Sequence, residues 1–137
     1  MRLKDKKVIQ IAILFIGVAI ILGALGAHAL EKVINSDKLA SFEVGVKYQM
    51  YHGLALLLLA VLSDKCNFSF KIVYRFIISG VCVFSGSIYA LVFQELIGVK
   101  LGVVFGPLTP IGGLLMIVGW VLLFIKVWKL KVVHDGE

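Results

Sequence analysis

The sequence lacks the short motifs that mark many enzymes and metal sites. It contains no CxxC motif, no HExxH motif, no phosphate-binding glycine loop and no arrangement of Ser, His and Asp typical of a catalytic triad. Its two cysteines do not suggest a disulfide, because Cys66 falls in a polar connection and Cys82 lies deep inside an apolar run. A bridge needs Cα atoms within about 7 Å, so both are expected to be free thiols. These absences predict that the chain is not an enzyme and uses no metal or cofactor.

Apolar side chains are the abundant component. Hydrophobic residues make up 61% of the 137 residues, and the mean hydropathy is +1.04. Soluble domains have about half apolar residues, so a soluble fold of this size could not bury so many, whereas a lipid bilayer can solvate them. The net charge of +6 sits at the edges of apolar runs, as in membrane topology. We therefore expect the lipid bilayer as a partner and no nucleic acid.

Four apolar segments are long enough to cross a membrane as helices, which takes about 20 residues. The spans are expected at about residues 8–30, 37–63, 72–93 and 110–130, within one transmembrane domain of residues 1–137. The predicted fold class is therefore all-α, a polytopic bundle of four transmembrane helices. The second span has a short apolar part, so it needs the amphipathic lead-in before it to cross fully.

The first span has a rival interpretation. A basic start, an apolar stretch and Ala27-His28-Ala29 together resemble a signal peptide with its cleavage site. The apolar run is longer than the usual 7–15 residues of a signal peptide, which favours a retained transmembrane helix.

The distribution of Lys and Arg predicts the orientation. With four spans, one side of the membrane holds ten of these residues, and they are Arg2, Lys4, Lys6, Lys7, Lys65, Lys71, Arg75, Lys126, Lys129 and Lys131. The other side holds four, and they are Lys32, Lys38, Lys47 and Lys100. Cytoplasmic segments carry the excess of positive charge, so both termini are expected inside the cell.

This threading brings the polar residues of the spans toward the outer half of the bundle. In hydrocarbon a polar group must find a partner or face water, so these side chains are expected to point inward and to bond to each other. The predicted cluster contains His28, Gln49, His52, Ser85, Ser87, Tyr89 and Thr109. It has two interpretations: hydrogen bonds that fix helix register, or a small-molecule, ion or proton site. Two histidines are too few for a zinc site.

Small residues at helical spacing predict faces where helix backbones approach closely. These residues are Ala19, Gly23, Ala27, Gly86, Gly112 and Gly119. The glycine-rich interval from residue 94 to 110 is expected to lack regular structure, and its middle, residues 99–108, to dip back toward the interface.

Four motifs in order carry a resemblance to a known family. They are Gly23-Ala24-Leu25-Gly26-Ala27-His28, then Tyr48-Gln49 with His52, then Phe84-Ser85-Gly86-Ser87-Ile88-Tyr89, and Thr109-Pro110-Ile111-Gly112-Gly113 with Gly119-Trp120. From about Gly17 to Lys129, the chain resembles a domain-of-unknown-function family of small bacterial membrane proteins with a eukaryotic transmembrane relative. The resemblance implies a four-span inner-membrane protein and no particular activity.

The sequence therefore predicts an integral membrane protein of the bacterial inner membrane. Its expected mode of action is helix packing or protein–protein contact, with a homo-oligomer or another membrane protein as candidate partners. The alternative is a ligand, ion or proton site in the outer polar cluster, including transport.

Overall fold

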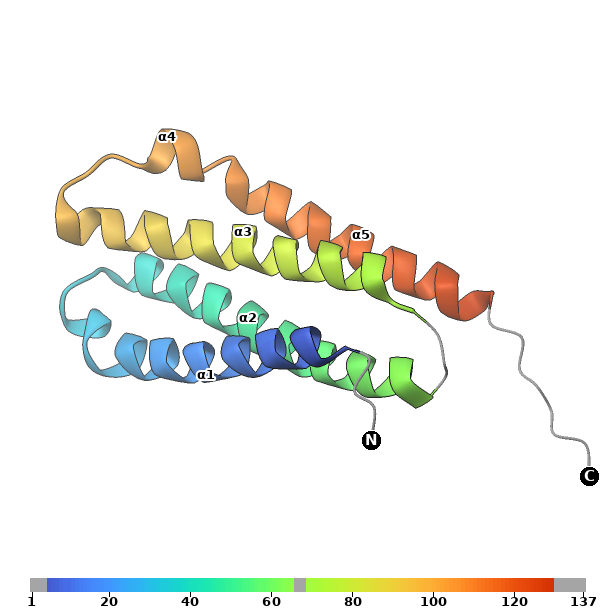
Figure 1. Cartoon of the computed structure of the whole chain (residues 1–137). Helices are drawn as coiled ribbons and strands as arrows, with labels where there is room; N and C mark the ends of the chain where they lie inside the picture. Colours follow the sequence, from blue (N-terminus) through green and yellow to red (C-terminus); the bar gives the residue numbers. More distant parts are fainter. Residues whose placement is uncertain (1–4, 66–68, 130–137) are drawn as a thin grey trace, which may run out of the picture.

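The structure, a computed structural model, describes residues 5–65 and 69–129 (Figure 1). Its helices are α1 (Lys6–His28), η1 (Leu30–Lys32), α2 (Ser36–Lys65), α3 (Lys71–Ile97), α4 (Gly102–Phe105) and α5 (Leu108–Trp128). Four helical segments are long and apolar enough to cross a membrane, and the described part contains no strand. The all-α, four-span prediction is confirmed. Cys66 and the last residue of the predicted fourth span lie outside the described residues.

The four long helices form two antiparallel hairpins, α1–α2 and α3–α5 (Figure 1). Helix packing is closest within each hairpin, and a smaller contact between α2 and α3 joins the two. Both hairpins turn at the same end of the bundle, which carries η1 and α4 and is called here the turn end. The other end, where α1 begins and α5 ends, is called the terminal end.

Polar side chains set the boundaries of the elements at the turn end. The Asn35 side chain accepts a hydrogen bond from the Lys38 backbone N–H at 2.9 Å, which caps the start of α2. From there α2 runs unbroken to Lys65, so the amphipathic lead-in and the second span are one helix. The expectation of an unstructured interval before the last span is wrong in part, because α4 forms a single helical turn within it.

The side of α1 that faces α2 repeats every seven residues. Ala12, Ala19 and Gly26 are its buried residues, and Gly23 is half-buried against α2. Ala27, which is predicted to share a packing face with Ala19 and Gly23, is exposed and lies off this buried side of α1. The reason is geometric: four residues advance a helix by about 400°, so a four-residue stripe drifts around the helix, whereas a seven-residue repeat returns to within about 20°.

Helices α3 and α5 approach through glycines on both partners. A Cβ added to Gly80 would meet the α5 backbone, one on Gly112 would overlap the backbone nitrogen of Phe84, and one on Gly119 would lie 2.8 Å from the α3 side chain opposite. Gly112 and Gly119 therefore lie where α3 and α5 come close together. Gly86 does not pack inside the bundle: it is exposed, and a Cβ added there would have no described atom within 4 Å.

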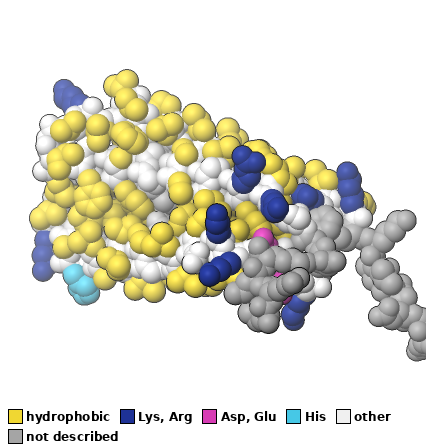
Figure 2. All heavy atoms as spheres, in the orientation of Figure 1, with side chains coloured by type: hydrophobic (Ala, Val, Ile, Leu, Met, Phe, Trp, Pro, Cys, Tyr) yellow, Lys and Arg dark blue, Asp and Glu magenta, His cyan; other side chains and the backbone are white. Residues whose placement is uncertain are grey.

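The outer surface suits a bilayer. Figure 2 shows hydrophobic side chains over the face in view, with Lys and Arg gathered mostly toward the terminal end and fewer at the turn end. This arrangement follows the predicted asymmetry of basic residues between the two sides of the membrane.

Candidate functional site

The first polar group joins three helices around Gln49, which is only 6% exposed. Its Nε2 donates to the Phe15 carbonyl of α1 at 2.9 Å, and its Oε1 accepts from the Tyr89 hydroxyl of α3 at 3.0 Å. Beside it, buried Ser85 of α3 donates to the Gly45 carbonyl of α2 at 2.8 Å. This group fixes α1, α2 and α3 relative to one another.

The second polar group joins α2 to α5 through His52. The His52 Nδ1 lies 2.8 Å from the Tyr48 carbonyl oxygen, and because a carbonyl can only accept, Nδ1 carries the proton. Nε2 is then an acceptor, and it receives the indole N–H of Trp120 at 3.1 Å. The arrangement requires a neutral imidazole, with both ring nitrogens occupied by partners within the chain.

The third polar group joins α3 to α5. The Ser87 hydroxyl lies 2.9 Å from the Phe84 carbonyl and 2.7 Å from the Thr109 hydroxyl. Ser87 has a single proton, and it goes to the carbonyl, so Thr109 donates to Ser87. These residues all come from the half of the α3–α5 hairpin nearer the turn.

The prediction that His28 shares a cluster with His52 is wrong. Along the α1–α2 hairpin, Gly53 lies against Ile16, so His52 is level with the middle of α1, and not with its outer end. His28 lies about 18 Å farther toward the turn end at 1.5 Å per residue, and its side chain is exposed. The other six predicted residues are brought into contacts, but in three separate groups instead of one.

Sequence reasoning missed a polar junction near the terminal end. The hydroxyl of buried Tyr74 on α3 lies 2.9 Å from Asp5 Oδ2 and 3.1 Å from the Leu59 carbonyl of α2. Buried Ser63 also hydrogen-bonds to this phenol. Two signals could have found the junction: a tyrosine hydroxyl one turn inside a span, and a single acid among basic residues before the first span.

These contacts provide hydrogen-bond partners for the buried polar side chains. Among the described residues, every buried side-chain nitrogen or oxygen has a hydrogen-bond partner. Within the same part of the chain, no three His, Cys, Asp or Glu side chains gather closely enough to hold a metal ion. The hydrogen bonds of the three polar groups therefore link the helices to one another.

A groove between α1 and α3 opens over the Gln49 group. Its volume is about 260 Å³, and we call it the α1–α3 groove. It is lined by Leu14, Phe15, Val18, Gln49, Val81, Cys82, Ser85, Gly86 and Tyr89. Cys82 is a free, exposed cysteine. The groove therefore combines apolar walls, a small-residue edge and a polar floor.

Four long apolar helices with internally satisfied polar groups define a small polytopic membrane protein. The chain belongs to the family described as "Protein of unknown function (DUF423)", which matches residues 22–113. It is 41% identical over 107 residues to a UPF0382 membrane protein of Staphylococcus aureus (strain bovine RF122 / ET3-1), covering 78% of this chain and 83% of the relative. A UPF0382 membrane protein of Staphylococcus saprophyticus is 38% identical over 108 residues, covering 79% and 85%. No solved structure matches.

Proposed function

We propose that this protein acts in the bacterial cell membrane through contact with a transmembrane helix of another subunit, at the α1–α3 groove. The subunit is a second copy of the chain or a different membrane protein. The membrane location itself follows from the family and the four apolar helices. The cell membrane, with both termini inside, is supported by the excess of Lys and Arg at the terminal end.

The observation that carries the proposal is the open environment of Gly86. In α3, the glycine at position 80 packs tightly against α5, whereas a Cβ added to Gly86 would have no described atom within 4 Å. Cys82, Gly86 and Ala90 recur every fourth residue on this helix. Helix association in lipid depends on van der Waals packing, and small residues allow backbones to approach closely. This edge of the groove is thus shaped for a helix that the single chain does not supply.

The polar groups support a structural role for the interior. His52 is the only described buried histidine, and both of its ring nitrogens are already bonded. His28, which would have completed an ion or proton site, lies outside the groups. The alternative of a small-molecule, ion or proton site therefore has weaker support than helix contact. We also propose that the protein is not an enzyme.

The proposal is tested by filling the groove. Gly86→Leu adds a side chain where the single chain has space, so folding and expression should remain normal. Gly17→Leu is the matched control, because Gly17 also has open space around it but does not line the groove. A photo-crosslinking residue at position 82 should give a defined adduct in native membranes, and Gly86→Leu should abolish it while Gly17→Leu leaves it unchanged.

The mass of the adduct separates the two kinds of partner, because a dimer of the chain and a complex with a different protein differ in size. A second crosslinker position, at the exposed Ile117 of α5, reports non-specific collisions. Adducts of equal yield from positions 82 and 117, or an adduct that Gly86→Leu does not reduce, would contradict the proposal.

A further inference from the structure

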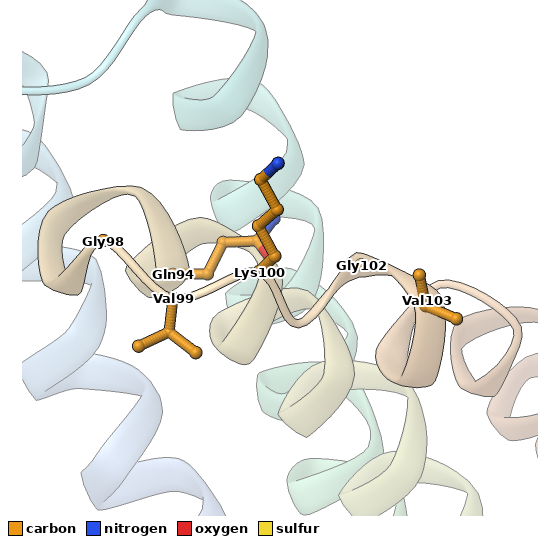
Figure 3. A pocket seen from close by; sticks show the side chains of 6 residues that line it. All are labelled: Gln94, Gly98, Val99, Lys100, Gly102 and Val103. Atoms are coloured by element: carbon orange, nitrogen blue, oxygen red, sulfur yellow. The ribbon is translucent and has the colours of Figure 1, made fainter.

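We propose that the turn between α3 and α4 binds the phosphate of an anionic phospholipid. A pocket of about 570 Å³ lies here, and we call it the turn pocket (Figure 3). It is lined by Gln94, Gly98, Val99, Lys100, Gly102 and Val103. None of these residues belongs to the three polar groups or to the α1–α3 groove.

The polar side of the turn pocket supplies a cation and oriented N–H donors. The Leu101 backbone N–H donates to Gln94 Oε1 at 2.7 Å, which fixes the carboxamide, and the Nε2 atom of the same group carries two N–H donors. The exposed Lys100 lines the same pocket, and Figure 3 shows its side chain extending from the turn beside that of Gln94. An ammonium group together with amide donors is a suitable combination for a phosphate oxygen.

The depth of the pocket matches the headgroup layer. Helix α3 has 27 residues, or about 40 Å at 1.5 Å per residue, close to the thickness of a bilayer with its headgroups. The turn after Gly98 therefore lies near the level of lipid phosphates. Gly98 adopts a left-handed conformation with φ 69°, which ends the helix at this level and sets the turn that holds Lys100.

The apolar side of the turn pocket identifies the source of the phosphate as a lipid. Val103 is 89% exposed and Val99 is 49% exposed. In Figure 3 the Val99 side chain points away from Lys100. Acyl chains would cover these two side chains, whereas a free phosphate ion would leave them in water. We therefore infer a diacyl phospholipid with a net negative headgroup, held by Lys100 and Gln94 at the phosphate and by the valines at the chains.

The inference is tested on the purified full-length protein in detergent by native mass spectrometry with short-chain lipids. The probes are dioctanoyl phosphatidylglycerol, dioctanoyl phosphatidylcholine and inorganic phosphate. Phosphatidylglycerol should bind about fivefold more tightly than phosphatidylcholine, as one lysine near a surface charge implies. Inorganic phosphate should bind much more weakly than either lipid. Lys100→Gln should remove the fivefold preference, and Lys100→Arg should keep it.

Two further variants make the test specific. Lys32→Gln is the matched control, because Lys32 is exposed at the same end of the bundle but does not line the pocket; it should keep the preference. Gln94→Glu keeps an oxygen for the Leu101 N–H but replaces the Nε2 donors with a second oxygen. It should lose phosphatidylglycerol binding without a change in melting temperature.

Equal affinity for the two lipids, or an unchanged preference in Lys100→Gln, would overturn the inference. So would an equal loss in Lys32→Gln, which indicates diffuse surface charge, or phosphate binding as tight as phosphatidylglycerol, which indicates a site for the free ion.

Discussion

Trp120 of α5 donates its indole N–H to Nε2 of His52 on α2, with a nitrogen–nitrogen distance of 3.1 Å. The bond connects the two hairpins at a point level with the middle of α1. The bond agrees with the tautomer of His52, because Nδ1 carries the ring proton and donates to the Tyr48 carbonyl, which leaves Nε2 as an acceptor. His52, a polar residue near the middle of the bundle, thereby joins α2 to α5.

Trp120→Phe should lower the free energy of unfolding by about 0.6–1.7 kcal/mol, the range for hydrogen bonds between membrane helices. The substitution removes the donor and leaves the acceptor nitrogen of His52 without its partner. Unfolding in mixed micelles by increasing SDS measures the change. Trp128→Phe is the control, because Trp128 is 79% exposed near the end of α5 and should change stability little. Equal effects of both substitutions would show that the bond contributes nothing.

Gly112→Ala should destabilise the protein by about 1–3 kcal/mol, as overpacking does. Its added methyl group would overlap the α3 backbone at Phe84, so α3 and α5 must separate. Gly113→Ala is the neighbouring control, because the nearest atom to its Cβ is 3.9 Å away. The same SDS titration compares the two, and a Gly112→Ala protein as stable as Gly113→Ala would contradict this account of the α3–α5 contact.

Gln49→Leu should cost more stability than Tyr89→Phe. Removing the carboxamide breaks the bonds to both Phe15 and Tyr89, whereas removing the tyrosine hydroxyl breaks only the second. At about 0.6 kcal/mol per bond, the expected losses differ about twofold. Stability is again measured by unfolding in mixed micelles. If Tyr89→Phe proved the more damaging of the two, Gln49 would not be the centre of this group.

Gly98→Ala should cost about 1 kcal/mol, because an alanine in the left-handed region is strained and Gly98 has φ 69°. Gly102→Ala should cost nothing measurable, since its Cβ would meet open space and its φ is not positive. Melting temperatures of the purified proteins report the difference. A neutral Gly98→Ala would mean that the turn relaxes to another conformation.

Single cysteines in a Cys66→Ser, Cys82→Ser background should establish the orientation. Val33→Cys lies between η1 and α2 at the turn end, and Lys65→Cys lies at the terminal end. A membrane-impermeant maleimide should label position 33 in intact cells and position 65 only after permeabilisation. The reverse order would invert the proposed orientation, and labelling of both positions from one side would contradict the four-span arrangement.

The spans could be predicted because the bilayer imposes a length and the basic residues mark the ends. The position of each polar side chain along the bundle could not. Helical periodicity says which face of a helix His28 occupies, but the length of the turn sets how α1 and α2 align along their axes. Threading alone predicts both His28 and His52 in the outer half of the bundle, whereas the actual alignment places His52 level with Ile16, near the middle of α1.

The packing faces show the same limit. The four-residue repeat contains Ala19, which is buried, and Ala27, which lies off the seven-residue seam and is exposed. The partner of His52 also could not be assigned, because Trp120 lies 68 residues away and reaches His52 only after α5 has packed on α3. Local sequence predicts the helices. The contacts between them depend on how the helices align along their axes, and this alignment is set only when the helices pack together.

The two-hairpin architecture implies an order of assembly. The seam through Ala12, Ala19 and Gly26 uses only residues of the first hairpin, so it can close while the rest of the chain is still being synthesised. The links to Tyr89, Tyr74 and Trp120 must wait until the second hairpin has entered the bilayer. A newly made protein would thus pass through an intermediate in which the Gln49 carboxamide is bonded to Phe15 but still lacks the Tyr89 hydroxyl, and the His52 imidazole still lacks the Trp120 indole N–H.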